Sequence, residues 1–172
     1  LQNSGLQYEI IIVNDGSIDS TTELLKELTM DNVILLEHPT NAGYGAAIKT
    51  GLLHAKHSWI GLIDADGSYD YKDIPSMISA AEEGFDMVVA KRENIRETDS
   101  FLKHIYRRTV EFLIRVIISK NIKDTNSGLR LIRKEAVMEF FPFLCSSFSF
   151  TTSVTTLFAE RGFFIKYISS TY

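Results

Sequence analysis

Residues 59–75, WIGLIDADGSYDYKDIP, join a short apolar run to two aspartates that lie one residue apart. The apolar run Trp59–Ile63 predicts a buried strand that ends at Asp64. Because side chains alternate along an extended chain, Asp64 and Asp66 would point the same way. Two neighbouring carboxylates repel each other unless a cation lies between them. The stretch therefore predicts a site for a hard divalent cation, Mg²⁺ or Mn²⁺, which would also hold a phosphorylated ligand.

Outward from this strand, apolar runs and helical patterns alternate along the chain. Further strands are predicted at Tyr8–Val13, Val33–Leu36 and Asp86–Ala90. Helices are predicted after Ser20, from Asn41 to about His57, and from Asp73 to Gly84. Ser20 and Glu23 have the spacing of a capping box. The short links between these elements favour a parallel sheet with helices on both faces, within one α/β domain.

Three polar turns follow predicted strands: Asn14–Ser17, Glu37–Gly45 and Asp64–Asp70. Open parallel sheets bind their ligands outside the carboxyl ends of the strands. Turns favour Asn, Asp, Gly and Ser in any protein, and this preference accounts for Asn14–Ser17. It accounts poorly for two carboxylates directly after an apolar strand, so a ligand site is expected at this edge of the sheet.

The composition fits one globular domain, because 45% of the 172 residues are hydrophobic. The lone cysteine, Cys145, allows no internal disulfide and fits a reducing compartment. The chain shows no secretory signal and no uncharged apolar run long enough to span a bilayer. A cytoplasmic location is therefore expected.

Charge is unevenly spread along the chain. The formal net charge is −4, yet residues 91–134 carry 12 Lys/Arg against 5 Asp/Glu. Within that segment, Phe101–Ser119 predicts a helix with one cationic arc and a wide apolar arc. Such a helix suits a membrane interface, and it also suits a core helix with a solvated basic face. Nucleic-acid binding is not expected, because the overall charge is negative and no aromatic reader face accompanies the helix.

An apolar strand followed by Asp-x-Asp-Gly-Ser also resembles the first motif of haloacid-dehalogenase-type phosphatases. In that family the first aspartate, here Asp64, is a phosphoryl-accepting nucleophile. The motif normally follows the first strand of its domain, whereas about two strand–helix units precede it in this chain. The phosphatase is therefore the second hypothesis for these residues.

Four stretches together resemble the family 2 glycosyltransferases of the GT-A fold, closest to the polyprenyl-phosphate branch typified by dolichol-phosphate mannose synthase. The stretches are YEIIIVNDGSIDST (8–21), NAGYGAAIKTGL (41–52), WIGLIDADGSYDYKDIP (59–75) and DTNSGLRLIRKEA (124–136). They come in the order and spacing of the family and cover nearly the whole chain. The resemblance implies a Rossmann-like, mostly parallel sheet with helices on both faces.

The resemblance also implies roles on the donor side. Asp15 would contact the base or ribose of the nucleotide, and Asn41 and Gly43 would line its pocket. Asp64 would lie near the ribose and donor sugar, and Asp66 would be the main metal ligand at the diphosphate. Ser68 stands where many relatives carry a glutamine that also binds the metal, so the metal set is Asp66, Asp64 and Ser68.

On the acceptor side, the resemblance places Asp124 where inverting relatives often have their base, and Arg130 facing phosphate oxygens. The implied reaction is an inverting displacement at the anomeric carbon of a UDP- or GDP-sugar. A sugar hydroxyl of a glycan would need Asp124 to take its proton. A polyprenyl phosphate is already anionic and needs no base. In this branch the region of Phe101–Ser119 lies at the membrane, which implies a place at its cytoplasmic face.

The chain departs from the family pattern at its start. The first strand of the fold and its loop have no counterpart before Tyr8, so we expect residues 1–172 to be one catalytic domain truncated at the N-terminus. Relatives often continue beyond the position of Tyr172, so truncation at the C-terminus is also consistent with the family pattern. The absent loop helps to cradle the nucleotide in relatives. A non-catalytic nucleotide-sugar-binding relic therefore stands as a third hypothesis.

Overall fold

The computed structural model describes residues 7–28, 30–92 and 122–170. The expected helix at Phe101–Ser119 lies outside these residues. In chain order the elements are β1 (Ile10–Asn14), α1 (Thr21–Lys26), β2 (Val33–Glu37), α2 (Tyr44–His54), β3 (Trp59–Leu62), η1 (Tyr71–Asp73), α3 (Ile74–Glu82), β4 (Met87–Arg92), β5 (Arg130–Arg133), α6 (Lys134–Glu139), η2 (Phe141–Phe143), α7 (Phe150–Arg161) and β6 (Ile165–Ser170).

The strands and helices predicted for the first half are all confirmed, with boundaries that differ by no more than three residues. The prediction of a capping box was wrong, because the Ser20 side chain makes no capping hydrogen bond at the start of α1. Asp73 precedes α3 as expected, with Pro75 in the first turn, but its side chain does not cap the helix either. Proline at this position has no backbone N–H to satisfy, so it starts the helix without cost.

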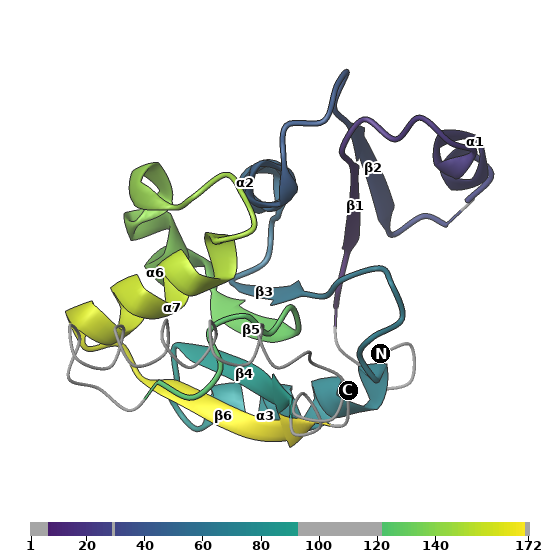
Figure 1. The fold of residues 1–172 in the computed structure, drawn as a ribbon. Coiled ribbons are helices and arrows are strands. Elements are labelled where there is room, and N and C mark those ends of the chain that lie inside the picture. Colours follow the sequence, from purple (N-terminus) through teal and green to yellow (C-terminus); the bar gives the residue numbers. More distant parts are fainter. Residues whose placement is uncertain (1–6, 29, 93–121, 171–172) are drawn as a thin grey trace, which may run out of the picture.

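The described strands form two sheets (Figure 1). Strands β1 and β2 pair in parallel, and the other sheet has the order β3-β5-β4-β6. Strand β5 is antiparallel to both β3 and β4, whereas β4 and β6 are parallel. Strands β3, β4 and β6 therefore share one direction, and β5 is inserted between β3 and β4 in the opposite direction.

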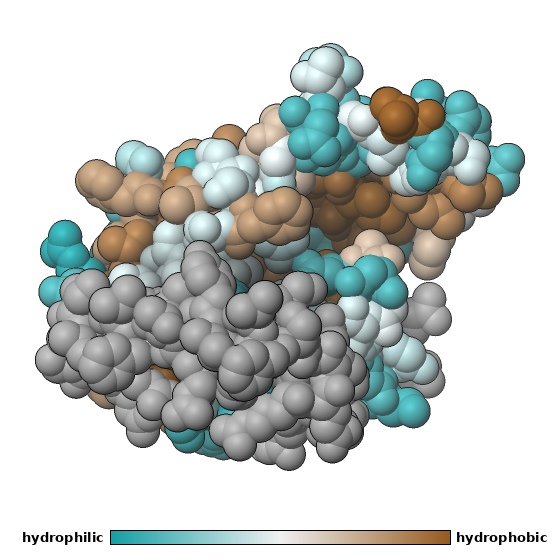
Figure 2. All heavy atoms as spheres, viewed as in Figure 1, coloured by the Kyte–Doolittle hydropathy of each residue, from teal (hydrophilic) through white to brown (hydrophobic). Residues whose placement is uncertain are grey.

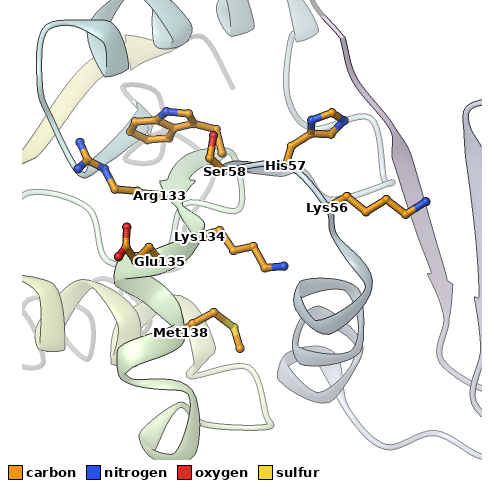
Figure 3. A pocket seen from close by; sticks show the side chains of 8 residues that line it. Lys56, His57, Ser58, Arg133, Lys134, Glu135 and Met138 are labelled. Carbon is orange, nitrogen blue, oxygen red and sulfur yellow. The ribbon is translucent and has the colours of Figure 1, made fainter.

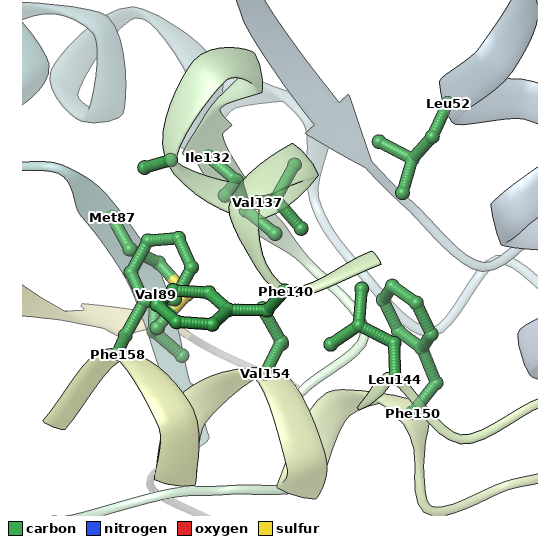
Figure 4. Packing of buried hydrophobic residues seen from close by; sticks show 11 residues of the cluster. Leu52, Met87, Val89, Ile132, Val137, Phe140, Leu144, Phe150, Val154 and Phe158 are labelled. Carbon is green, nitrogen blue, oxygen red and sulfur yellow. The ribbon is translucent and has the colours of Figure 1, made fainter. Parts of the chain in front are cut away.

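Alternation along β4 places apolar side chains on both faces of the four-stranded sheet. Met87 and Val89 join one core cluster with side chains of α6 and α7 (Figure 4). Val88 and Ala90 join another cluster with Met77 and neighbouring alanines of α3. All four β4 side chains are fully buried. Helices thus cover both faces of this sheet, as predicted, and hold its strand ends in fixed positions.

The register between β3 and β5 determines where the polar loops meet. Leu62, the last residue of β3, pairs with Arg130, the first residue of β5. Because the pair is antiparallel, the carboxyl end of β3 lies beside the start of β5. The loop that contains Asp64 and the loop that begins at Asp124 therefore converge at one edge of the sheet.

The β1–β2 sheet is less enclosed than the four-stranded sheet. Ile10 is 38% exposed, and the other apolar residues of both strands are only partly buried. Figure 2 shows apolar residues gathered over this region at the upper right. Among the described helices, none is long and apolar enough to cross a membrane.

Candidate functional site

Asp64 lies where the two converging loops touch. Its Oδ1 accepts a hydrogen bond from the Tyr44 hydroxyl at 2.9 Å. Its carboxylate rests directly on Gly128, where a Cβ would lie 2.9 Å from Oδ1 and closer still to Oδ2. Burial, followed by the nearby Asp64 charge, raises the pKa of Tyr44, so its hydroxyl stays a donor at neutral pH. Tyr44 and Gly128 together fix the direction in which this carboxylate points.

The segment Thr125–Gly128, called here the acceptor loop, is held by buried hydrogen bonds. The Gly128 N–H donates to the Tyr69 hydroxyl at 2.6 Å. The Ser127 hydroxyl donates to the Ala90 carbonyl at 2.6 Å, which ties the loop to β4. Within the loop only Asn126 is exposed. These hydrogen bonds within the chain fix the backbone of the loop.

Arg130 lies beneath the acceptor loop with none of its surface exposed. Its Nε donates to the Ser127 carbonyl at 3.0 Å, and its Nη2 donates to the carbonyls of Thr125, at 3.2 Å, and Ser127. Burial lowers the pKa of Arg130 to about 10, so the guanidinium remains charged at neutral pH. The predicted contact of Arg130 with phosphate oxygens stays a prediction.

Asp124 is buried and paired with Arg92 at the end of β4. The Arg92 guanidinium donates from Nε and Nη2 to the two carboxylate oxygens, each at 3.1 Å, and the Asn126 N–H donates to Oδ1 at 3.0 Å. Burial alone would raise the pKa of Asp124, but the Arg92 hydrogen bonds and charge outweigh it and lower the pKa. This carboxylate therefore holds a proton only at acidic pH.

Asp66 is in a different environment from Asp64, although one residue separates them. It is exposed, and its carboxylate accepts a hydrogen bond from the Ser68 N–H at 2.9 Å. Hydrogen bonds from the Ser68 side chain and backbone lower the pKa of Asp66. Asp66 thus presents an ionised carboxylate to solvent at the carboxyl end of β3.

These oxygens fit a hard divalent cation. Among the described residues, no three His, Cys, Asp or Glu side chains gather closely enough to form a complete metal cage. Mg²⁺ and Mn²⁺ need no such cage in nucleotide sites, because one or two carboxylates and the phosphates of the ligand suffice. Asp66 can supply such a carboxylate, with Asp64 and the Ser68 hydroxyl nearby in the chain.

Asp15, predicted to bind the nucleotide, lies at the end of β1 and organises the following loop. Its two oxygens accept the N–H groups of Ala42, at 2.9 Å, and Gly43, at 2.8 Å. His38 Nδ1 lies 2.6 Å from Oδ1, and its Nε2 lies 2.9 Å from the Thr50 hydroxyl. Burial would raise the pKa of Asp15, but these hydrogen bonds lower it overall.

Gly43 and Gly45 allow another segment of the chain to approach the start of α2. A Cβ at Gly43, where φ is +102°, would lie 2.8 Å from the Ser146 carbonyl. At Gly45 a Cβ would overlap the backbone of Cys145 and Ser146. The Ser146 carbonyl accepts the Ala46 N–H at 3.0 Å. The glycines therefore dock α2 onto this segment, while Asn41 beside them is exposed.

The structure brings three predicted residues together, because Asp64, Asp124 and Arg130 all contact the acceptor loop. Asp66 lies two residues beyond Asp64 in the chain and is exposed, with Ser68 as its hydrogen-bond partner. Asp15, Asn41 and Gly43 lie together at the ends of β1 and β2. Sequence reasoning missed Tyr44, Tyr69 and Arg92. The hydroxyl of a buried tyrosine needs a hydrogen-bond partner, and this requirement could have pointed to Tyr44 and Tyr69.

A separate pocket of about 540 Å³ lies at the opposite end of β3 and contains none of the predicted site residues. Lys56, His57, Trp59, Arg133 and Lys134 are among its lining (Figure 3). The labelled side chains of Figure 3 point in different directions rather than toward one centre. The pocket therefore lacks convergent groups for a specific ligand, and the polar loops beyond Asp64 remain the candidate site.

Comparison with known proteins identifies the family of the chain. A family model described as glycosyl transferase family 2 matches residues 1–141. A dolichyl-phosphate beta-glucosyltransferase of Dictyostelium discoideum is 31% identical over 80% of this chain and 46% of its own length. An undecaprenyl-phosphate 4-deoxy-4-formamido-L-arabinose transferase of Yersinia pestis is 33% identical over 91% of this chain and 51% of its own length. The chain thus spans about half the length of the curated relatives it matches.

Among solved structures, glucosyl-3-phosphoglycerate synthase of Mycobacterium tuberculosis, in complex with Mn²⁺, UDP and glucosyl-3-phosphoglycerate, superposes with a TM-score of 0.72. The match covers 95% of this chain and 59% of that one, at 16% sequence identity. This similarity confirms the predicted GT-A fold. The named relatives also confirm the predicted resemblance to the polyprenyl-phosphate branch.

Proposed function

Because the chain belongs to glycosyl transferase family 2, we propose that it transfers a sugar from a nucleotide-sugar donor to a polyprenyl phosphate. Two relatives bear names that contain such an acceptor, dolichyl phosphate in one and undecaprenyl phosphate in the other. A structural neighbour was solved with UDP and Mn²⁺. Family membership removes the phosphatase hypothesis, in which Asp64 would be the nucleophile.

The environment of Asp124 is the observation that carries the choice of acceptor. A general base works best with a pKa near the operating pH. Asp124 instead has a lowered pKa, and both of its oxygens accept hydrogen bonds from Arg92. A sugar hydroxyl would need a better base than this carboxylate. A phosphate monoester is anionic at neutral pH, since its second pKa is about 6, and brings its own nucleophilic oxygen.

The proposed reaction is a displacement with inversion at the anomeric carbon. An acceptor phosphate oxygen forms the new bond to that carbon, and the bond to the donor diphosphate breaks with its electron pair on the departing nucleoside diphosphate. A bound Mg²⁺ or Mn²⁺ would neutralise the charge that grows on the diphosphate. Asp66 would hold that ion with Asp64 and Ser68, and no proton moves in the step.

On the donor side, we assign Asp15, Asn41 and Gly43 to the nucleotide. Asp15 fixes the Ala42–Gly43 backbone at the start of α2, beside the exposed Asn41. Leu52 of α2 belongs to the same core cluster as residues of α6 and α7, which is why we treat the chain as one catalytic domain. A lipid acceptor lies in a membrane, so we propose that the enzyme acts at the cytoplasmic face of that membrane.

The test is a transfer assay with undecaprenyl and dolichyl phosphate as acceptors and a panel of UDP- and GDP-sugars as donors, each with Mn²⁺. Lipid-linked sugar is expected from one donor, and Asp124→Asn is expected to retain turnover within about ten-fold. If Asp124 were the general base, the same substitution would lower turnover by about 10²–10⁴-fold. Such a loss, or transfer to a glycan hydroxyl alone, would contradict the acceptor proposal. Metal-dependent nucleotide binding without any turnover would favour the relic.

A further inference from the structure

Arg130 is a cation that the fold encloses completely. Its Nη1 donates to the Thr155 hydroxyl at 2.9 Å and to the Thr151 carbonyl at 3.2 Å, both on α7. Its Nε and Nη2 donate to the acceptor-loop carbonyls of Ser127 and Thr125. The planar fork of arginine suits such a role, because its five N–H groups have fixed directions. One side chain thus ties the acceptor loop to α7.

The acceptor loop in turn contacts the donor-side carboxylate. Ser127, whose carbonyl Arg130 holds, immediately precedes Gly128. Gly128 has the Asp64 carboxylate packed against its Cα and donates its N–H to Tyr69. A shift of the Ser127 carbonyl would therefore move Gly128, and Asp64 would follow. Thr155, Arg130, the acceptor loop and Asp64 form one continuous series of contacts.

We propose that Arg130 is a positioning residue: it holds the acceptor loop from beneath, so that Gly128 fixes the Asp64 carboxylate at the donor site. This role replaces direct binding of the acceptor phosphate by Arg130 and rests on the proposed function. A phosphate could reach the guanidinium only by displacing the buried carbonyls of Thr125 and Ser127. Leaving those acceptors unpaired is costly inside a protein.

Two substitutions separate positioning from phosphate binding. Arg130→Lys keeps the positive charge but cannot make the fork of hydrogen bonds. In Thr155→Val, the new valine has nearly the same shape as threonine. The substitution removes the hydroxyl that accepts a hydrogen bond from Arg130. Thr155 is fully buried on α7 and cannot touch a ligand. Thr156→Val on the same helix is the matched control, because Thr156 is only partly buried and is not among the contacts of Arg130.

The first readout is amide hydrogen exchange of residues 125–128 in the protein without ligand. Positioning predicts exchange about ten-fold faster in Arg130→Lys, a smaller increase in Thr155→Val, and wild-type exchange in Thr156→Val. Circular dichroism checks that each variant is folded, and Thr155→Val keeps the test open if Arg130→Lys does not fold. Wild-type exchange in Arg130→Lys would overturn the proposal. This readout needs no donor or acceptor.

The second readout is calorimetric binding of UDP and GDP with Mn²⁺, since Asp64 lies at the donor site. For the nucleotide that wild type binds, affinity is expected to fall about ten-fold in Arg130→Lys and about three-fold in Thr155→Val. A phosphate-binding role predicts unchanged nucleotide affinity in both and a raised acceptor KM in Arg130→Lys. That pattern would overturn the proposal. Failure of wild type to bind either nucleotide would count against the proposed function, while hydrogen exchange still decides the role of Arg130.

Discussion

The loop after β3, Asp64–Asp70, and the acceptor loop before β5 meet at the same edge of the sheet but are held in different ways. The acceptor loop is buried except at Asn126. It is bound to the Ala90 carbonyl of β4, to the Tyr69 hydroxyl and, through Arg130, to α7. The β3 loop is mostly exposed around Asp66 and Gly67. It contacts the acceptor loop near both of its ends, through Asp64 and Tyr69.

The buried acceptor loop and the exposed loop after β3 are suited to different roles. Buried, fully paired groups give a fixed geometry, and their loss costs folding free energy. An exposed carboxylate such as Asp66 adds little to stability and is available to a metal ion. Substitutions in the acceptor loop should therefore lower stability and activity together, whereas disturbances at Asp66 should lower activity alone.

Removal of the metal gives the largest expected effect on activity. Chelation by EDTA should abolish sugar transfer, because the departing diphosphate then lacks its counter-charge. The thermal unfolding midpoint without nucleotide should stay unchanged, because Asp66 is exposed. Turnover should return on addition of Mn²⁺. Full turnover after exhaustive chelation would show that the β3 loop has no metal role.

Gly128→Ala should break the contact between the two loops. The added Cβ would overlap the Asp64 carboxylate, which must then move. Displacement of a reacting group by about 1 Å can cost about 10²-fold, so a fall of that size is expected in kcat. Gly61→Ala in β3 is the control, because a Cβ there meets nothing within 4 Å. Equal turnover in both variants would mean that the contact does not position Asp64.

Much of this arrangement could be predicted from sequence, and part could not. The β-branched runs ending in polar turns located β1 to β4, because local patterns determine strand ends in parallel sheets. The antiparallel insertion of β5 has no local signal, since it depends on pairing between Leu62 and Arg130, which are far apart in the chain. For the same reason the contact of Asp64 with Gly128 was not foreseen.

For the site residues, too, the sequence did not reveal the contacts with residues far away in the chain. The residue types at Asp64 and Asp66 predicted a metal site, and the family resemblance placed Asp124 on the acceptor side. The environments of Asp64 and Asp124, however, depend on partners that are far away in the chain. Arg92 makes Asp124 a poor base, and Tyr44 fixes Asp64. Arg130 was expected at the surface of a ligand site, yet α7 encloses it. Burial of a long cation is decided by packing and is not visible in the sequence stretch 124–136 that contains Arg130.

Asp124→Asn should lower the stability of the protein, because it breaks the ion pair with Arg92 beside the acceptor loop. Breaking a buried ion pair leaves Arg92 uncompensated, and a loss of about 3 kcal/mol in the free energy of unfolding is expected. Denaturant titration at pH 7 measures it. Turnover with polyprenyl phosphate should survive in the folded fraction. A variant as stable as wild type would mean that the Arg92 pair does not anchor the acceptor loop.

The same pair predicts a pH dependence of stability. The pKa of Asp124 is lower in the folded chain than the ordinary 3.8, so the unfolded chain binds more protons as the pH falls. The contribution of the pair is complete above the unfolded value and is lost as the pH falls through the folded value. Denaturant titrations of wild type and Asp124→Asn should therefore converge below that range. A constant gap between them down to the lowest accessible pH would contradict the assignment.

Tyr44→Phe should give the smallest effect. It removes the hydroxyl that donates to Asp64 and leaves the ring in place. One hydrogen bond to a charged group corresponds to roughly a ten-fold change, expected in kcat rather than in stability. Tyr71→Phe, at an exposed position 70% accessible to solvent, is the control. Equal kinetics in the two variants would show that Gly128 alone is enough to position Asp64.

The proposed transfer depends on a metal-dependent nucleotide site at the carboxyl end of β3, and calorimetry with UDP and GDP measures binding at that site. Each nucleotide is titrated with and without Mn²⁺ into wild type and Asp66→Asn. One nucleotide is expected to bind wild type only with Mn²⁺, and this binding is expected to be lost in Asp66→Asn while the fold is retained. Binding that is indifferent to Mn²⁺, or equal in Asp66→Asn, would contradict it.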